Sequence, residues 1–426
     1  MPAHRGDPVT HLPFDPHEQV RVGLVGIGRR QGGLLANWLA ADGAVITAVC
    51  DLDTDRAAQA CDRIRDAGQE PPAAYGSEHG LADLLARDDV DLVCVATPWD
   101  QHVPVAVTAL DAGKHVCVEV PAATTLDGCW ELVEASERNQ RHCVMMENCC
   151  YGQSELLMLN LIHAGLLGDL IHGDAAYIHD LRAYLVNGGR DWRRLVHTQR
   201  DGNLYPTHGL GPIAMYMDIN RGDRFETLVS MSSAQHGLEQ FRAEHAAADD
   251  PSWAETYICG DANTSLIRTA AGRTIMLQHQ VANPRPYDRF NRICGTRGAF
   301  ADFPPRIYLD GQDGPEEYTD LEAYRARFEH RLWRDDGPQA RRLGGHGGMD
   351  FIMIQRLVDC MRAGIVPDTD VYDAAAWSAP GPLSDQSVAA GSAPVKVPDF
   401  TRGHWTSPRG TLIEAAPERA DATPAR

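Results

Sequence analysis

A chain of 426 residues, 43% of them hydrophobic, is long enough to bury the cores of two domains. Its formal net charge of −20, with no basic run, would repel phosphate and argues against a nucleic-acid partner. No apolar stretch is long enough to cross a bilayer, and Met1–Glu18 lacks the apolar core of a secretory signal, so a cytoplasmic protein without membrane contact is expected.

Strand and helix patterns alternate over the first part of the chain. Helices are predicted at about 32–41, from Thr54 as N-cap to about 67, at 103–111 and at 127–139. Between them lie predicted strands at 20–25, 44–50, 90–96, 115–120 and 142–146. Continuous apolar strands separated by helices indicate a parallel sheet covered on both faces. The fold class is therefore α/β, with a Rossmann domain, a doubly wound parallel sheet, over residues 18–150.

The pattern changes after about Tyr151. After a predicted helix at 155–164 come strand-like runs at 170–179, 225–232, 255–269, 273–281 and 290–294. Short turns such as Ala271-Gly272 join several runs, which favours a largely antiparallel open sheet. A charged helical region at 321–342 and an amphipathic helix at 349–363 complete a predicted α+β substrate domain over 151–405. Residues 406–426, rich in Ala, Pro and Glu, are expected to be disordered.

The first predicted strand ends in the glycine turn of a dinucleotide site. Gly26 allows the tight turn, and Gly28 lets backbone amides approach a pyrophosphate at a helix N-terminus. Gln31 replaces the third glycine of the pattern, although Gly32 and Gly33 follow directly and could keep the helix close to the strand. The glycine motif alone is weak evidence for a dinucleotide-binding site, and its position between a predicted strand and a predicted helix strengthens that evidence.

Charged residues around this turn indicate which cofactor binds. Asp51 ends the second strand, where a carboxylate hydrogen-bonds ribose hydroxyls and repels a 2′-phosphate, so NAD is favoured over NADP. Arg29 and Arg30 can pair with the pyrophosphate. Two further turns, TPWDQH at 97–102 and EVP at 119–121, follow strands at the sheet edge where ligands of open α/β sheets bind.

This order of motifs resembles the glucose–fructose oxidoreductase, inositol dehydrogenase and rhizopine-catabolism superfamily. Most dehydrogenases of that group carry Glu-Lys-Pro, in which the lysine assists proton removal from the alcohol being oxidised. Here Val120 stands between Glu119 and Pro121 in place of that lysine. The departure argues against an ordinary sugar dehydrogenase.

A more specific resemblance is to glycoside hydrolase family 109, whose characterised members are NAD-dependent α-N-acetylgalactosaminidases. It implies bound NAD and the same activity. The similar stretches run from about residue 20 to 405 and lie at 119–123, 147–151, 173–180, 202–212, 220–223, 344–353 and 370–377.

The resemblance also implies a redox-neutral mechanism, an exception to the usual pair of carboxylates. NAD oxidises the sugar C3 hydroxyl to a ketone, which acidifies the proton on C2; a base removes that proton, and the aglycone leaves from C1. Water then adds to the enone, and NADH returns the hydride to C3. The protein must supply bases near C2 and C3, an acid near the leaving group, and a site that retains the reduced cofactor.

Residues 205–208 (YPTH) suit this chemistry, because a helix start stabilises developing negative charge. Pro206 is predicted in the first turn, with Thr207 as a capping residue. By resemblance, Tyr205 and His208 are candidates for proton transfer, and Tyr177 and His179 for further acid/base or binding roles. The resemblance further implies substrate contacts from Tyr177, Arg193, Tyr205, Pro206, Thr207, His208 and Tyr287, and cofactor contacts from Trp99, Asp100, Gln101, His102, Glu119, Val120 and Asn148.

Other interpretations stay open. A lone histidine at a helix start is more often structural, and the alternation of Tyr177 and His179 also fits a plain strand face. The alternatives are an NAD-dependent dehydrogenase of a sugar or inositol, with net NADH production, and a non-catalytic sugar or NAD sensor on the same fold.

Metal binding and disulfides are not expected. The sequence has no H-E-x-x-H motif and no tight histidine spacing, so no metal site is predicted. Its 11 cysteines include no C-x-x-C pair, as is typical of reduced, buried thiols. The expected partner is a small-molecule or glycan substrate, and by analogy the open sheet could pair to give a dimer or tetramer.

Overall fold

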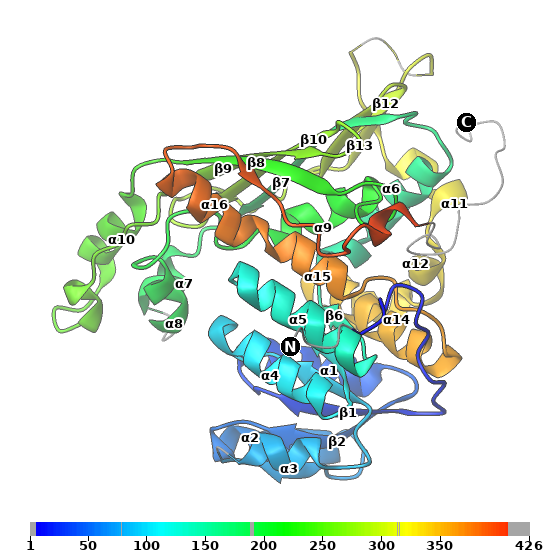
Figure 1. Cartoon of the computed structure of the whole chain (residues 1–426), viewed down its shortest axis with the longest axis vertical. Helices are drawn as coiled ribbons and strands as arrows, with labels where there is room; N and C mark the ends of the chain where they lie inside the picture. Colours follow the sequence, from blue (N-terminus) through cyan, green and yellow to red (C-terminus); the bar gives the residue numbers. More distant parts are fainter. Residues whose placement is uncertain (1–5, 78, 188–190, 313, 315, 408–426) are drawn as a thin grey trace.

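The computed structural model describes residues 6–77, 79–187, 191–312, 314 and 316–407, arranged around two β-sheets (Figure 1). Residues 408–426, most of the predicted disordered tail, lie outside the described residues. None of the helices in the described ranges has the length and apolar content that a membrane crossing needs.

The first sheet is six-stranded and parallel, with strand order β3-β2-β1-β4-β5-β6. Its strands are β1 (Val20–Val25), β2 (Ala44–Cys50), β3 (Ala73–Tyr75), β4 (Leu92–Val95), β5 (His115–Val118) and β6 (Cys143–Met145). The connecting helices are α1 (Arg29–Ala40), α2 (Thr54–Asp66), α3 (Gly80–Leu85), α4 (Trp99–Asp111) and α5 (Leu126–Asn139). The predicted doubly wound α/β fold is confirmed.

Local details of this half differ from the sequence expectations. Asp53, not Thr54, caps α2, because its carboxylate accepts hydrogen bonds from the backbone N–H groups of Asp55 and Arg56. Helix α4 begins at Trp99, so the TPWDQH segment is already helical after Pro98. The short β3 and α3 were not predicted, because three strand residues carry too little pattern to be recognised.

The packing expected from Gly32 and Gly33 is wrong. Gln31 is buried between α1 and β4, where its Oε1 accepts a hydrogen bond from the thiol of Cys94 at 3.3 Å. Gly33 is exposed, and a Cβ there would have no neighbour within 4 Å. Helix α1 therefore contacts the sheet through the Gln31 side chain and its hydrogen bond with Cys94. The close helix–strand approach that a third glycine would allow does not occur here.

The second sheet has nine strands in the order β14-β13-β12-β11-β7-β10-β9-β8-β15. Its strands are β7 (Leu170–Ile178), β8 (Phe225–Ser232), β9 (Asn263–Thr269), β10 (Thr274–Gln280), β11 (Arg292–Gly295), β12 (Gly298–Ala301), β13 (Arg306–Leu309), β14 (Thr319–Asp320) and β15 (Val395–Lys396). β7 and β10 run parallel, and the other pairings in the described part are antiparallel, as predicted for a largely antiparallel sheet.

One predicted strand begins later than expected. The run from Glu255 pairs only from Asn263 onward. The carboxylate of Asp261 instead accepts hydrogen bonds from the backbone N–H groups of His236 and Gly237, at the start of a helix. Because the Asp261 side chain hydrogen-bonds the free N–H groups at this helix start, the segment before Asn263 is held outside the β-sheet.

Helices of the second half are mostly short. They are α6 (Gln153–His163), α7 (Arg182–Asn187), α8 (Asp191–Val196), α9 (Thr207–Tyr216), α10 (Gly237–His245), α11 (Glu322–Phe328), α12 (Arg331–Asp335), α13 (Gly337–Leu343), α14 (Met349–Ala363), α15 (Val371–Ser378) and α16 (Pro380–Ala389). Single 3-10 turns occur at η1 (Asn148–Tyr151), η2 (Pro251–Ala254), η3 (His346–Gly348) and η4 (His404–Thr406). The helices predicted at 321–342 and 349–363 are confirmed.

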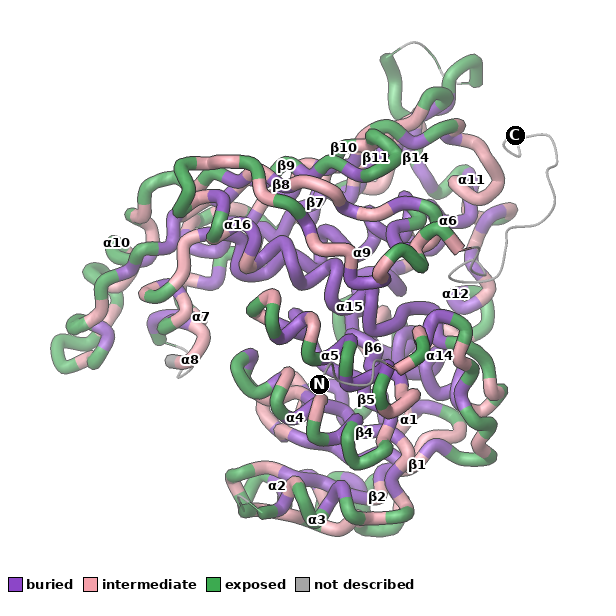
Figure 2. Tube along the Cα trace, viewed as in Figure 1, coloured by how far each residue is buried: buried purple, intermediate pink, exposed green. Residues whose placement is uncertain are grey.

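Two fully buried helices join the sheets. Helix α9 packs on β7, and α15 packs on α5, β6 and α9, so both lie in the continuous buried layer between the two sheets (Figure 2). The far face of the second sheet exposes Ile171, Met231 and Leu266. The dimer or tetramer expected from such a face stays a prediction.

Gly209 sets how closely α9 approaches β7. A Cβ at this position would overlap the backbone of Ala176 on β7. We expect Gly209→Ala to push the helix outward and to destabilise the protein by about 1–3 kcal/mol, the usual cost of overpacking. Urea unfolding measures the change, with Gly33→Ala as the control, because a Cβ at Gly33 meets nothing and favours the helix. An unchanged midpoint for Gly209→Ala would contradict this close packing.

Three buried histidines make the fold acid-sensitive. Burial and nearby positive groups lower the pKa of His115 to about 3, of His197 to about 4 and of His330 to about 3. Between these values and about 6.5, the unfolded chain binds protons that the folded chain does not. The free energy of unfolding is therefore unaffected by these groups above about pH 6.5. Below that pH it decreases by about 1.4 kcal/mol per pH unit for each histidine.

The expected result is a melting temperature that drops steeply as the pH is lowered from about 7 to about 5. His115→Gln should flatten this dependence, whereas the same substitution at the exposed His404 should not. A pH-independent melting temperature would show that these histidines are not buried as neutral bases.

Candidate active site

Most of the predicted site residues lie where the carboxyl ends of the parallel strands face β7 and α9. Glu119 and Glu147 follow β5 and β6, and Trp99 opens α4 after β4. Tyr177 comes from β7, and His208 lies in the first turn of α9. Residues from distant parts of the chain therefore converge at the sheet edge where ligands of open α/β sheets bind.

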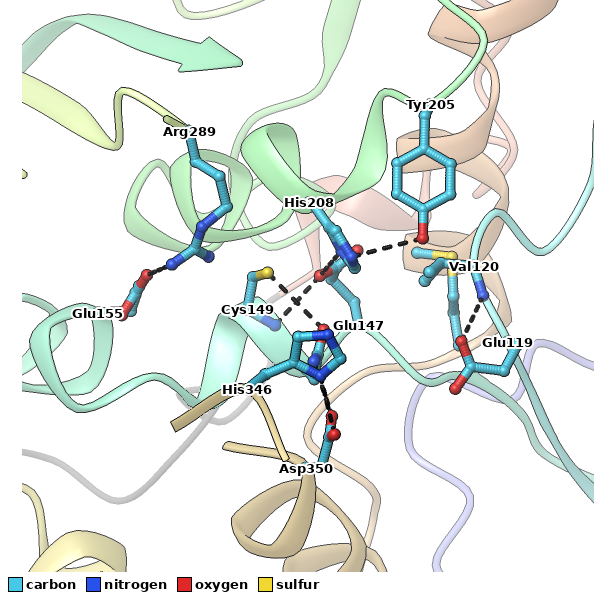
Figure 3. A network of polar contacts seen from close by, with 12 residues as sticks. Glu119, Val120, Glu147, Cys149, Glu155, Tyr205, His208, Arg289, His346 and Asp350 are labelled. Carbon is cyan, nitrogen blue, oxygen red and sulfur yellow. Dashed lines mark hydrogen bonds and ion pairs between the residues drawn. The ribbon is translucent and has the colours of Figure 1, made fainter. Parts of the chain in front are cut away.

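A buried imidazole–carboxylate pair forms the centre of the site (Figure 3). His208 Nδ1 lies 2.7 Å from Glu147 Oε1, and Glu147 is 1% exposed. The backbone N–H of Cys149 donates to the same oxygen at 3.1 Å. Burial acts to raise the pKa of Glu147, but the charge and hydrogen bond of His208 outweigh it and hold the pKa below its ordinary value. The carboxylate therefore stays ionised and orients the ring.

Glu147 was not among the predicted site residues. It directly follows the strand predicted at 142–146, as Glu119 follows the strand before it. The rule that singled out Glu119, a carboxylate at the carboxyl end of a parallel strand, could have found Glu147 as well.

Tyr205 extends the pair into a chain of three groups. Its hydroxyl lies 3.4 Å from His208 Nε2, and its ring packs 4.5 Å from that of Tyr177, centroid to centroid. Burial, together with the neighbouring phenol of Tyr177, raises the pKa of Tyr205 well above its ordinary value. The phenol thus stays protonated and can donate a hydrogen bond. Phenol, imidazole and carboxylate together form a route along which a proton can move.

Tyr177 and His179 form a second pair on the same face of β7. The Tyr177 hydroxyl lies 3.1 Å from His179 Nδ1. Burial raises the pKa of Tyr177, whereas burial and the charge of Arg193 lower that of His179. At neutral pH this pair consists of a protonated phenol and an uncharged imidazole, one donor and one acceptor beside the first pair.

Aromatic rings and a guanidinium surround these two pairs. Trp99 stacks on Tyr205 with 5.7 Å between centroids, and the Arg193 guanidinium lies 4.9 Å from the Trp99 ring and 5.0 Å from the Tyr205 ring. Tyr287, 43% exposed, packs edge-on against His179 at 5.1 Å. Trp99 is buried in this cluster, and its predicted cofactor contact stays a prediction.

The helix start at 205–208 differs in detail from the prediction. Thr207 is the first residue of α9, and Pro206 precedes it as the N-cap without a capping side chain. Both residues are buried. The Thr207 side chain therefore does not cap the N-terminal N–H groups of α9, and this helix end remains able to stabilise negative charge.

The glycine turn fits a dinucleotide. Gly26 has φ +84°, which side chains other than glycine rarely adopt, and Gly28 is the N-cap of α1 without a capping side chain. A Cβ at Gly28 would meet nothing within 4 Å, and the first turn of α1 carries no acidic residue. Asp51 lies beside the turn, where its Oδ2 accepts a hydrogen bond from Ile27 N at 2.5 Å. Open space and free helix N–H groups beside this carboxylate match the diphosphate and ribose of NAD.

Arg30 has carboxylate partners where a pyrophosphate contact was predicted. Its Nε donates to Glu119 Oε1 at 2.8 Å, and its two terminal nitrogens each lie 3.1 Å from Asp350 at the start of α14. Asn148 Nδ2 also donates to Asp350, at 2.7 Å. This buried network ties the glycine turn to the second half of the chain. Arg29 is exposed at the same turn, with its guanidinium 5.8 Å from the Tyr184 ring, and can still meet an anion.

Residues of the predicted 99–102 contact take different positions. His102 is buried, and its two ring nitrogens lie 2.8 Å from Pro121 O and 2.9 Å from Thr97 O. It therefore joins the two turns that follow β4 and β5. Asp100 and Gln101 are exposed on α4, and Val120 is buried.

Two family profiles cover most of the chain. The profile described as "Glycosyl hydrolase 109, C-terminal domain" matches residues 151–407, and "Oxidoreductase family, NAD-binding Rossmann fold" matches residues 20–147. A "Glycosyl hydrolase family 109 protein" of Solibacter usitatus is 56% identical over 397 residues, 92% of this chain and 90% of its own. A protein of the same name in Shewanella pealeana is 47% identical over 94% of this chain and 89% of its own.

Solved structures of similar fold include a sugar dehydrogenase and an inositol dehydrogenase homologue. Levoglucosan dehydrogenase in complex with NADH and levoglucosan has a TM-score of 0.68 at 18% identity, over 89% of this chain and 100% of that one. An inositol dehydrogenase homologue from Azotobacter vinelandii, complexed with NADH and myo-inositol, has a TM-score of 0.60 at 19% identity, over 92% and 100%. At this identity the likeness shows the fold.

Proposed function

The chain belongs to glycosyl hydrolase family 109 and has an NAD-binding Rossmann domain, and on this premise we propose that it hydrolyses terminal α-N-acetylgalactosaminyl linkages without net consumption of NAD. The observation that carries the proposal is the arrangement of two proton-transfer pairs side by side, His208 with Glu147 and Tyr177 with His179. The sugar specificity rests on the family resemblance, and the mechanism on these pairs.

The central carboxylate argues against ordinary glycoside hydrolysis. That reaction uses a protonated acid, with a raised pKa, opposite a second carboxylate. Glu147 has a lowered pKa and gives one oxygen to His208 and Cys149 N. It therefore suits the orientation of a base better than the donation of a proton to a leaving group.

The chain's own groups can serve each proton transfer. His208, oriented by Glu147, takes the proton of a ring hydroxyl, and the Tyr205 phenol hydrogen-bonds the oxygen that becomes electron-rich. Tyr177 and His179 serve the adjacent ring carbon and the departing oxygen. NAD, when bound at the glycine turn, supplies a hydride acceptor that is restored within each turnover. Val120 removes the lysine that an ordinary dehydrogenase would use, which favours this cycle over net oxidation.

The test follows two signals together. Purified protein is mixed with NAD and an aryl α-N-acetylgalactosaminide, and aryl alcohol release is recorded alongside NADH absorbance. Many equivalents of alcohol without accumulating NADH are expected. NADH formation without alcohol release would instead indicate a dehydrogenase, and neither signal across a panel of amino sugars and hexosides, despite NAD binding, would indicate a sensor.

A further inference from the structure

Three potential metal ligands meet beside the central pair. A carboxylate oxygen of Glu147, the thiol of Cys149 and a ring nitrogen of His208 all lie within 4.8 Å of one another, and all three residues are buried (Figure 3). The sequence spacing gave no sign of this cluster, because Glu147 and Cys149 follow β6 whereas His208 comes from α9.

A second observation indicates that the cluster has unused bonding capacity. Glu147 Oε1 accepts from His208 and from Cys149 N, but the other oxygen, Oε2, is fully buried without a hydrogen-bond partner in the described structure. The neighbouring Thr207 hydroxyl acts on the Glu147 carboxylate as a hydrogen-bonding group and helps to lower its pKa, but it makes no bond of good geometry. A buried carboxylate oxygen with so weak a partner is costly, and a bound cation would satisfy it.

We propose that Glu147, Cys149 and His208 bind one thiophilic divalent cation of the zinc and cadmium class. Thiolate, imidazole and carboxylate are the ligands that these ions prefer, and three protein ligands leave a fourth position for water. On binding, Cys149 releases its thiol proton to solvent and forms the metal–sulfur bond, so thiolate and carboxylate together balance the two positive charges.

One positively charged side chain, Arg289, lies beside Cys149. Arg289 is itself paired with Glu155 at 2.7 Å, which limits its repulsion of a cation. The cluster thus combines a carboxylate with a thiol that becomes anionic on binding the metal, beside a guanidinium whose charge is partly offset by Glu155.

Occupation of the cluster would block the reaction. The metal takes the lone pair of His208 and the charge of Glu147, the two features that proton transfer requires. This inhibition rests on the proposed function, whereas binding itself rests only on the geometry of the three residues.

The experiment titrates the full, chelator-treated protein with CdCl2 and records the ultraviolet thiolate-to-cadmium absorption together with the heat of binding. One equivalent is expected, with competition by ZnCl2. Cys149→Ala should abolish the absorption and weaken binding by roughly 100-fold or more, since even the loss of an outer-shell partner costs about 10–100-fold. Cys150→Ala is the matched control, because that neighbouring thiol is equally buried but is not one of the three grouped ligands.

Two results would overturn the proposal: no binding to the wild-type protein, or an absorption that survives in Cys149→Ala, which would place the metal at other thiols. If cadmium binds as expected but aryl glycoside release is never seen, the metal site stands and the proposed function fails. If both are seen, zinc should inhibit release in the wild type, and Cys149→Ala should lose this sensitivity.

Discussion

Replacing His208 with alanine should lower kcat for glycoside release by about 10²–10⁴-fold, the range that general acid–base catalysis contributes. His208 is the group through which Tyr205 and Glu147 connect, at 3.4 Å and 2.7 Å, so its loss interrupts the proposed route completely. NAD affinity should change little, because the glycine turn and Asp51 do not contact this ring. Steady-state kinetics and NAD titration measure the two effects separately.

A chemical role is distinguished from a structural one by rescue. Added imidazole should restore part of the rate of His208→Ala, which a variant that had only lost stability would not show. The melting temperature of the variant should fall, because the buried Glu147 carboxylate loses its imidazole partner. A variant that retains a rate within a few-fold of the wild type would remove His208 from the mechanism.

Glu147→Gln should produce a loss of similar size, about 10²–10⁴-fold in kcat, by analogy with the loss of a carboxylate that orients a catalytic histidine. Glutamine keeps the size of the side chain and removes the charge that holds the His208 ring. Because the pKa of Glu147 lies below its ordinary value, the wild-type carboxylate stays ionised as the pH falls through the neutral range. The loss of rate should therefore persist throughout the neutral range, because the wild-type carboxylate remains ionised there.

The control for this variant is Glu119→Gln. Glu119 is also a buried carboxylate after a parallel strand, but it pairs with Arg30 instead of a histidine. Its loss should act on NAD retention more than on kcat at saturating NAD. Equal effects of the two substitutions on kcat would contradict the proposal that Glu147 orients His208 as the base.

The sequence predicted the elements with strong local patterns. Continuous apolar strands such as 90–96, and the helix at 349–363, appear close to their expected places, because burial on both faces and amphipathic spacing depend on neighbouring residues. The motif at 205–208 placed His208 and Tyr205 together for the same reason: four consecutive residues at a helix start cannot be far apart.

Contacts between distant segments were not predictable from local patterns. His208 and Glu147 are 61 residues apart, and Arg30 and Asp350 are 320 apart. Only the fold brings Asp350 to Arg30 and gives that arginine two carboxylate partners, while its predicted contact with a pyrophosphate stays a prediction. Gln31, which replaces the third glycine of the motif, packs between a helix and a strand. His102 joins two turns, and its predicted cofactor contact stays a prediction.

The central claim is that the chain breaks the glycosidic bond by removing and returning a proton on the sugar, and hydrolysis in heavy water tests it most directly. The released sugar is isolated and examined by NMR and mass spectrometry for deuterium at C2. Proton transfer by the Tyr177–His179 pair predicts deuterium from the solvent at C2 of the released sugar. Efficient release of sugar without deuterium at C2 would mean that the bond is cleaved by direct displacement, and would contradict the proposed role of both proton-transfer pairs.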